Sequence, residues 1–99
     1  DMGVMSLIRA RYPELPLYSS TQTTVHNAEG AVLLDKLGFK QVVLARELSA
    51  KEIRAIQAAS PIQIECFVHG AHCMCMSGAC YLSAMLGGQP RPLRAAVQA

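Results

Sequence analysis

Three short apolar segments suited to β-strands alternate along this chain with segments of helical periodicity. The strand-like segments start near residues 16, 41 and 61, and a helix-like segment separates each from the next. Strands joined through a helix in this way pair in parallel, through a right-handed crossover. The sequence therefore predicts an α/β fold of βα repeats with parallel strands. Periodicity alone is compatible with an open doubly wound sheet and with part of a closed barrel.

Local signals set the expected boundaries of these elements. Asn27 is a good N-cap for the second helix, and Gly38 is typical of a helix C-terminus. Ser49 followed by Glu52 forms a capping box, which predicts the start of the third helix. The expected helices are 3–12, 28–38, 50–59 and 80–86, and the expected strands are 16–20, 41–45 and 61–68.

The composition fits a piece of a larger α/β protein. The 99 residues are 52% hydrophobic and only 16% charged, as for strands buried on both faces, but they are too few for a complete barrel. The formal charge of +2 does not by itself indicate a nucleic-acid-binding protein. The chain shows no signal-peptide pattern and no apolar run of about 18–20 residues. We therefore expect a cytoplasmic location and no membrane partner.

Polar side chains gather where each expected strand ends. In a parallel sheet these carboxyl ends meet at one edge, where α/β enzymes place their sites. The residues at this edge are 19–24, 46–47 and 65–80. Hydroxyl residues after a strand are also ordinary turn and cap residues. With that alternative open, the predicted substrate-binding residues are Ser20, Thr21 and Gln22.

All four cysteines lie within residues 65–83, together with His69 and His72. Thiolates are soft ligands for zinc or an iron–sulfur cluster, and clustered cysteines in the cytoplasm indicate metal or redox chemistry more than disulfides. Cysteine is also a common small buried residue. Cys66 lies within the third expected strand, where we expect it to pack. Cys73 and Cys80 are the better candidates for metal binding, with glycines at 70 and 78 allowing tight turns around them.

Glu65 is unusual in an apolar strand, because an unpaired buried carboxylate is costly. It must be paired or line a cavity. Arg46 and Glu47, at the end of the preceding strand, offer a partner or further site groups, so a structural brace between strand ends explains them as well as catalysis does. His69 is a candidate general base or ligand, or a hydrogen-bonded loop histidine. The predicted catalytic candidates are Glu65, His69, Arg46 and Glu47.

Segment 65–83 resembles the signature of the collagenase-like U-thirty-two peptidases, a family of unassigned catalytic type. The signature has a glutamate, a phenylalanine, two cysteines each preceded by a glycine, and a serine. Segments 20–27 and 43–49 are also similar to the family, so the resemblance covers about residues 1–88. His72, where the family has an aliphatic residue, and Cys75, in a variable gap, depart from the pattern. The matching residues are Glu65, Phe67, Gly70, Ala71, Cys73, Gly78, Cys80, Leu82 and Ser83.

The resemblance implies a TIM-barrel-like domain of which this chain holds a part. It also implies an enzyme, inactive as this fragment alone. Relatives in the family bind a [4Fe–4S] cluster through four cysteines and take part in hydroxylation of RNA bases or quinone precursors. Carried over by position, Cys73 and Cys80 match the first two cluster cysteines. RNA or protein would then be the substrate of the intact enzyme, and no stable protein partner can be predicted.

The tail of the chain, residues 89–99, does not match the family, which has a Gly-Asn-Arg-Gly-x-Cys-Ala-Gln-Pro-Cys-Arg run there. Codons can be chosen for residues 88–99 that encode this run when read one base later. We therefore predict a barrel fragment over 1–88 and a non-homologous, frame-shifted tail over 89–99. The nucleotide sequence tests this, because other codons at these positions would exclude the shift.

Two other functions remain open. A genuine protease would need a nucleophile with a base and an oxyanion pocket, and neither a triad nor a His-Glu-x-x-His zinc motif can be identified. A small non-enzymatic zinc-binding module would use three cysteines and a histidine. It would leave the three βα units without a role. Its ligands would be Cys73, Cys75, Cys80 and His69 or His72.

Overall fold

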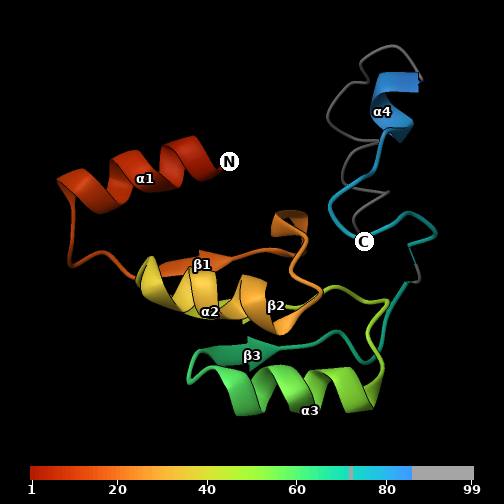
Figure 1. Ribbon diagram of the computed structural model, residues 1–99. Coiled ribbons are helices and arrows are strands. Elements are labelled where there is room, and N and C mark those ends of the chain that lie inside the picture. The colour runs from red at the N-terminus through yellow and green to blue at the C-terminus, as the bar shows by residue number, and fades with distance from the viewer. Residues whose placement is uncertain (72, 86–99) are drawn as a thin grey trace.

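The computed structural model describes residues 1–71 and 73–85. Its three strands form one parallel sheet in the order β1-β2-β3, and single helices connect them (Figure 1). The expected α/β arrangement of a partial βα repeat is therefore confirmed. The elements are α1 (Met2–Arg11), β1 (Leu17–Ser19), the 3-10 turn η1 (Thr21–Thr23), α2 (Ala28–Lys36), β2 (Phe39–Val43), α3 (Ala50–Ala59), β3 (Gln63–Glu65) and α4 (Leu82–Met85).

The caps that set the helix starts form as predicted. Asn27 Oδ1 accepts a hydrogen bond from the Gly30 N–H at 2.8 Å and fixes the start of α2. Ser49 and Glu52 form the full capping box of α3, with the Ser49 N–H donating to Glu52 Oε2 at 2.7 Å. These contacts satisfy main-chain donors that a helix start leaves unpaired.

All three strands differ from the expected ranges, and β1 is one residue shorter at each end. β2 begins at Phe39, two residues earlier than predicted, and ends at Val43. Ala45 does not continue it because its N–H donates instead to the Val25 carbonyl, at 2.9 Å, in the connection between β1 and α2. β3 covers only 63–65, since the chain beyond it leaves the sheet and Val68 is 93% exposed. Tertiary hydrogen bonds thus shorten segments that the apolar pattern alone extends.

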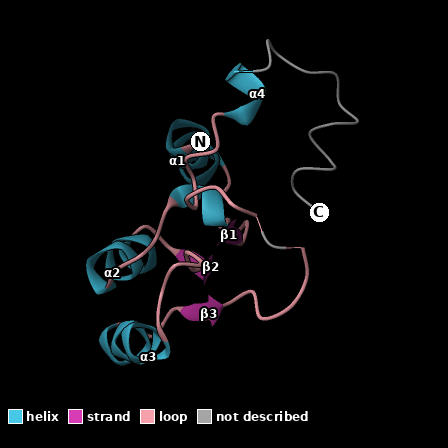
Figure 2. Ribbon diagram, turned by 90° about the vertical axis from the view of Figure 1, so that its right-hand side faces the viewer, coloured by secondary structure: helices cyan, strands magenta, loops and turns pink. Residues whose placement is uncertain are grey.

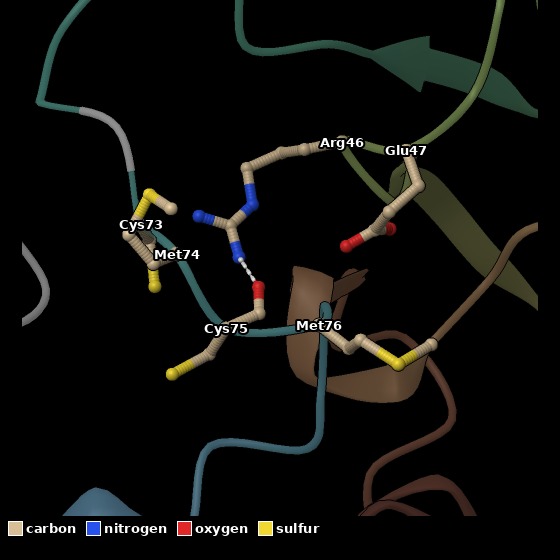
Figure 3. Close-up of a pocket in the computed structure, with 6 residues that line it drawn as sticks. All are labelled: Arg46, Glu47, Cys73, Met74, Cys75 and Met76. Carbon is tan, nitrogen blue, oxygen red and sulfur yellow. Dashed lines mark hydrogen bonds between the residues drawn. The ribbon is translucent and has the colours of Figure 1, made fainter.

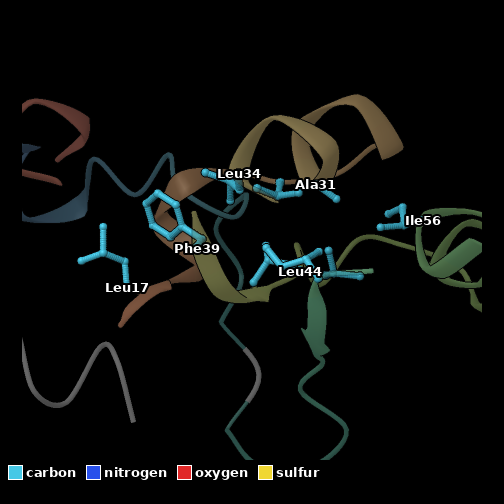
Figure 4. Packing of buried hydrophobic residues seen from close by; sticks show 9 residues of the cluster. Leu17, Ala31, Leu34, Phe39, Leu44 and Ile56 are labelled. Atoms are coloured by element: carbon cyan, nitrogen blue, oxygen red, sulfur yellow. The ribbon is translucent and has the colours of Figure 1, made fainter. Parts of the chain in front are cut away.

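The core lies between the sheet and the pair α2 and α3, which cover the same face (Figure 2). Val42 in the central strand and Ala31 in α2 are fully buried, and Ile56 brings α3 onto them (Figure 4). Cys66 is partly buried against this core, which confirms its predicted packing role. The core residues are Leu17, Val25, Ala31, Leu34, Phe39, Val42, Leu44, Ile56 and Ile62.

The opposite face of the sheet carries no helix within the described part of the chain (Figure 2). Side chains alternate between faces along a strand, and the register sets Gln41 beside Gln63 and Val43 beside Glu65. The Gln41 side-chain amide donates to Glu65 Oε2 on this face. None of the described helices is long and apolar enough to cross a membrane.

Candidate functional site

The loop of residues 73–80, called here the cysteine loop, lies against the carboxyl edge of the sheet. Together with the segment that follows β2 it lines an open cavity of about 310 Å³ (Figure 3). Two charged side chains, two thiols and two thioethers surround this cavity, so it offers soft sulfur ligands beside a cation and an anion. The lining residues are Arg46, Glu47, Cys73, Met74, Cys75 and Met76.

Ser77 anchors the cysteine loop to the end of β2. Its side chain is buried, and its Oγ accepts hydrogen bonds from the Arg46 main-chain N–H at 3.2 Å and from Arg46 Nε at 3.4 Å. In return the Ser77 N–H donates to Glu47 Oε1 at 2.8 Å. Arg46 also donates through Nη2 to the Cys75 carbonyl oxygen at 3.2 Å. Arg46 and Glu47 therefore have a structural role in holding the loop, and a catalytic role for them stays a prediction.

Gly78 anchors the same loop to the segment that follows β1. Its φ is +82°, a left-handed value that glycine adopts readily. A Cβ at this position would overlap Thr24 Oγ1 and would come within 3.3 Å of the Gln22 carbonyl oxygen. Thr24 is itself left-handed, with φ of 56°. The turns at Thr24 and Gly78 are therefore in close contact. The segments that follow β1 and β2 both contact the cysteine loop, as the polar residues at the strand ends predict.

We expect the hydrogen bond between the Ser77 N–H and the Glu47 carboxylate to weaken at low pH. The hydrogen bond from the Ser77 main-chain N–H lowers the pKa of Glu47 from its ordinary 4.5. A lowered pKa in the folded state means that the contact contributes fully above pH 4.5 and is lost as pH falls below it. Hydrogen-exchange protection of the Ser77 amide should therefore fall below that pH. In Glu47→Gln the protection should not depend on pH, and an equal fall in both proteins would contradict the assignment.

The predicted substrate-binding residues form the turn beside this contact. Ser20 Oγ accepts from the Gln22 N–H at 3.2 Å and caps η1. Ser19 is buried and its Oγ is 2.8 Å from Thr23 Oγ1. Ser20 therefore acts as a helix cap, which is the alternative that the sequence left open for it. Substrate binding by Ser20, Thr21 and Gln22 stays a prediction.

The cysteine loop carries three thiols, of which Cys73 and Cys75 line the cavity. The Arg46 guanidinium, which lines the same cavity, is the main cause that lowers the pKa of Cys73. The hydrogen bond with Cys80, followed by burial, raises the pKa of Cys75. Cys75, which the sequence places in a variable gap, therefore has its titration affected by both predicted metal ligands. Sequence reasoning gave it no role in the cluster, and its position now makes it a group to test.

Glu65 and His69 lie outside this arrangement. Glu65 is exposed and pairs with Gln41, so the expectation of a buried carboxylate is wrong. It does not form the suggested brace with Arg46, because its register partner is Val43 and Arg46 lies beyond the strand end. His69 is exposed, and no hydrogen bond joins its side chain to any described residue. Catalysis by either residue stays a prediction, and His72 lies outside the described residues.

The described residues do not contain a complete metal site. Over 1–71 and 73–85 no group of three or more histidine, cysteine or acidic side chains is arranged to hold a metal ion. The thiols of Cys73 and Cys80 are of the right chemistry for iron–sulfur ligation, which needs four such ligands. Two thiols do not complete such a ligand set, so iron–sulfur binding through Cys73 and Cys80 stays a prediction.

Comparison with known proteins assigns the family. The sequence model described as Peptidase family U32 matches residues 1–94, nearly the whole chain. The chain belongs to peptidase family U32. The resemblance carried by residues 65–83 is therefore confirmed. No solved structure matches the chain significantly.

Curated members of family U32 carry names of two kinds. A 23S rRNA 5-hydroxycytidine synthase of Escherichia coli is 46% identical over 83 residues, which cover 84% of this chain and 12% of that protein. The tRNA hydroxylation protein P of the same organism is 42% identical, over 84% of this chain and 18% of that protein. A collagenase of Porphyromonas gingivalis is 35% identical, over 81% and 22%. The U32 chain thus spans about a fifth or less of the length of these relatives.

Two residues of this U32 site escape sequence reasoning. Ser77 and Thr24 make the contacts that dock the cysteine loop, yet neither is of a type that signals metal or acid–base chemistry. The Ser77-Gly78 pair is a turn signal that could have pointed to a tight contact. Thr24 closes the polar segment after β1, but nothing in that segment distinguishes it from its neighbours.

Proposed function

We propose that this chain is part of an RNA-base-hydroxylating enzyme and supplies Cys73 and Cys80 to an iron–sulfur cluster. The observation that carries the proposal is the docked cysteine loop at the carboxyl edge of the sheet, with both cysteines in a family whose curated members include RNA hydroxylation proteins. RNA would be the substrate of the full-length protein, and the cytoplasm its location. No stable protein partner is proposed.

An iron–sulfur cluster exchanges single electrons when it is bound, and its potential depends on hydrogen bonds to its sulfurs and on burial. The residues of this chain would prepare the place for it. Ser77 and Gly78 hold the loop that carries Cys73 and Cys80 against the sheet before any metal is present. Arg46 offsets the negative charge of a thiolate beside the cavity. The remaining ligands and the substrate-binding surface would come from other parts of the full-length protein.

A proteolytic function is the second candidate, because the family and one curated relative carry protease names. It needs an activated nucleophile. Among the side chains that the structure describes, no serine or cysteine forms a hydrogen bond with a histidine, and the one hydrogen bond of a histidine ring joins His26 to the Thr24 carbonyl. These contacts give proteolysis no support, and the names of the curated relatives remain the support for hydroxylation. A non-enzymatic zinc module gains no support from the described cysteines and His69.

The test uses the full-length protein that contains this chain, purified without oxygen. We expect a brown protein that contains iron and inorganic sulfide. Its gene should restore hydroxylated nucleosides, measured by mass spectrometry, to the tRNA or rRNA of a strain that lacks it. Gelatin cleavage should be absent. A colourless, iron-free protein that cleaves gelatin would overturn the proposal in favour of the peptidase.

A further inference from the structure

Four consecutive side chains of the cysteine loop contain sulfur, and all four line the cavity at the end of β2. Cys73 and Cys75 are free thiols that are partly exposed to solvent. Met74 and Met76 are thioethers that are 88% and 73% exposed, so core packing does not explain them. In Figure 3 Met74 lies beside Cys73, whereas Met76 extends away from both cysteines. The cavity therefore offers two thiols and one neighbouring thioether to a ligand.

We propose that Cys73 and Cys75, together with the thioether of Met74, form a binding site for copper(I). The site uses Cys75, to which the family pattern gives no role. It shares only Cys73 with the residues proposed to bind an iron–sulfur cluster. The copper site therefore does not rest on the proposed function.

The chemistry of the three sulfurs selects this metal. Thiolate and thioether sulfurs are soft ligands, which favour copper(I), zinc and iron–sulfur clusters. Zinc takes a tetrahedral set of four ligands, and the described part of the chain contains no group of even three histidine, cysteine or acidic side chains placed to hold a metal. Copper(I) accepts fewer ligands than zinc does. Two thiolates and a thioether are therefore enough for it.

The charges at the cavity also suit copper(I) held by two thiolates. Each thiol releases its proton to water on binding, so two copper–sulfur bonds replace two S–H bonds and the copper stays monovalent. The product carries a net negative charge. The Arg46 guanidinium lines the same cavity and offsets that charge. The Glu47 carboxylate already accepts a hydrogen bond from the Ser77 N–H at 2.8 Å, which offsets part of its own charge.

The test uses the full-length protein that contains this chain, without metal and without oxygen. Copper(I) is supplied as its coloured bicinchoninate complex, and loss of the colour measures transfer to the protein. We expect Cys73→Ser and Cys75→Ser each to lose one of the copper ions that the unsubstituted protein binds. Met74→Leu should bind copper more weakly but lose less than either serine variant. Met85→Leu, which changes an 81% exposed methionine of α4, is the matched control and should bind as the unsubstituted protein does.

Cys80→Ser separates the copper site from the proposed iron–sulfur cluster. Cys80 does not line the cavity, so Cys80→Ser should keep its copper and lose its iron after reconstitution with iron and sulfide. Cys75→Ser should do the opposite. Loss of copper in Cys80→Ser, or full copper binding in Cys75→Ser, would overturn the copper site. If the unsubstituted protein binds no iron, the proposed function fails and the copper results still decide the copper site.

X-ray absorption at the copper edge checks the ligands in the copper-loaded Cys80→Ser protein. We expect sulfur neighbours only, and fewer of them in Met74→Leu. Nitrogen neighbours would assign the copper to histidines and overturn the proposal. A full-length protein that takes no copper from the bicinchoninate complex would overturn it as well.

Discussion

Replacing Gly78 with alanine should release the cysteine loop from the edge of the sheet. The new Cβ would overlap Thr24 Oγ1, and Thr24 cannot easily move because it already occupies a left-handed conformation. Overpacking costs about 1–3 kcal/mol, and a non-glycine residue at positive φ costs about as much again. We expect the free energy that docks the loop to fall by about 2–5 kcal/mol. Hydrogen-exchange protection of the Ser77 amide in the full-length protein measures it.

Gly38→Ala is the matched control for this experiment. Gly38 has φ of +81°, so alanine there meets the same backbone strain. Its nearest neighbours are guanidinium atoms of Arg9 at 3.3 Å, at the end of a flexible side chain that can give way. Gly38→Ala should therefore leave Ser77 protection unchanged, and Gly78→Ala should also lose bound iron where Gly38→Ala does not. Equal effects of the two substitutions would show that the contact between Gly78 and Thr24 does not hold the loop.

The fold could be predicted from the sequence wherever the signal is local. Asn27, and Ser49 with Glu52, act within one helical turn, and the helices begin where these residues place them. The ends of β2 and β3 depend on partners distant in sequence. Ala45 bonds to Val25, and the chain after Glu65 leaves the sheet, so an apolar run predicts strands that are too long.

The same contrast between local signals and distant partners applies to the candidate site. The carboxyl-edge rule places Arg46, Glu47 and the cysteine loop together because it follows from parallel topology. It does not say which side chains meet. Glu65 points to the open face with Gln41, since side chains alternate along a strand and the register pairs Glu65 with Val43. Ser77 carries the central contact through its buried hydroxyl, which no spacing in the sequence signals.

Serine substitutions in the cysteine loop should divide the thiols by function. We expect Cys73→Ser and Cys80→Ser each to lose most of the iron of the full-length protein, because a hydroxyl is a poor ligand for an iron–sulfur cluster. Iron content per protein and visible absorbance after anaerobic reconstitution measure this loss. Cys66→Ala, partly buried against the core, should keep the iron and lose only stability.

Cys75→Ser is the decisive member of this series. The family pattern gives Cys75 no ligand role, yet its side chain lines the cavity together with Cys73. If the family pattern holds, Cys75→Ser retains its iron. Cys75 could still replace Cys73 or Cys80 as a ligand when one of these two is removed. A double variant tests this replacement directly. Adding Cys75→Ser to Cys73→Ser should cause no further loss of iron. A further loss in the double variant, or a full loss in Cys75→Ser alone, would make Cys75 a ligand and would leave the assignment of Cys73 and Cys80 incomplete.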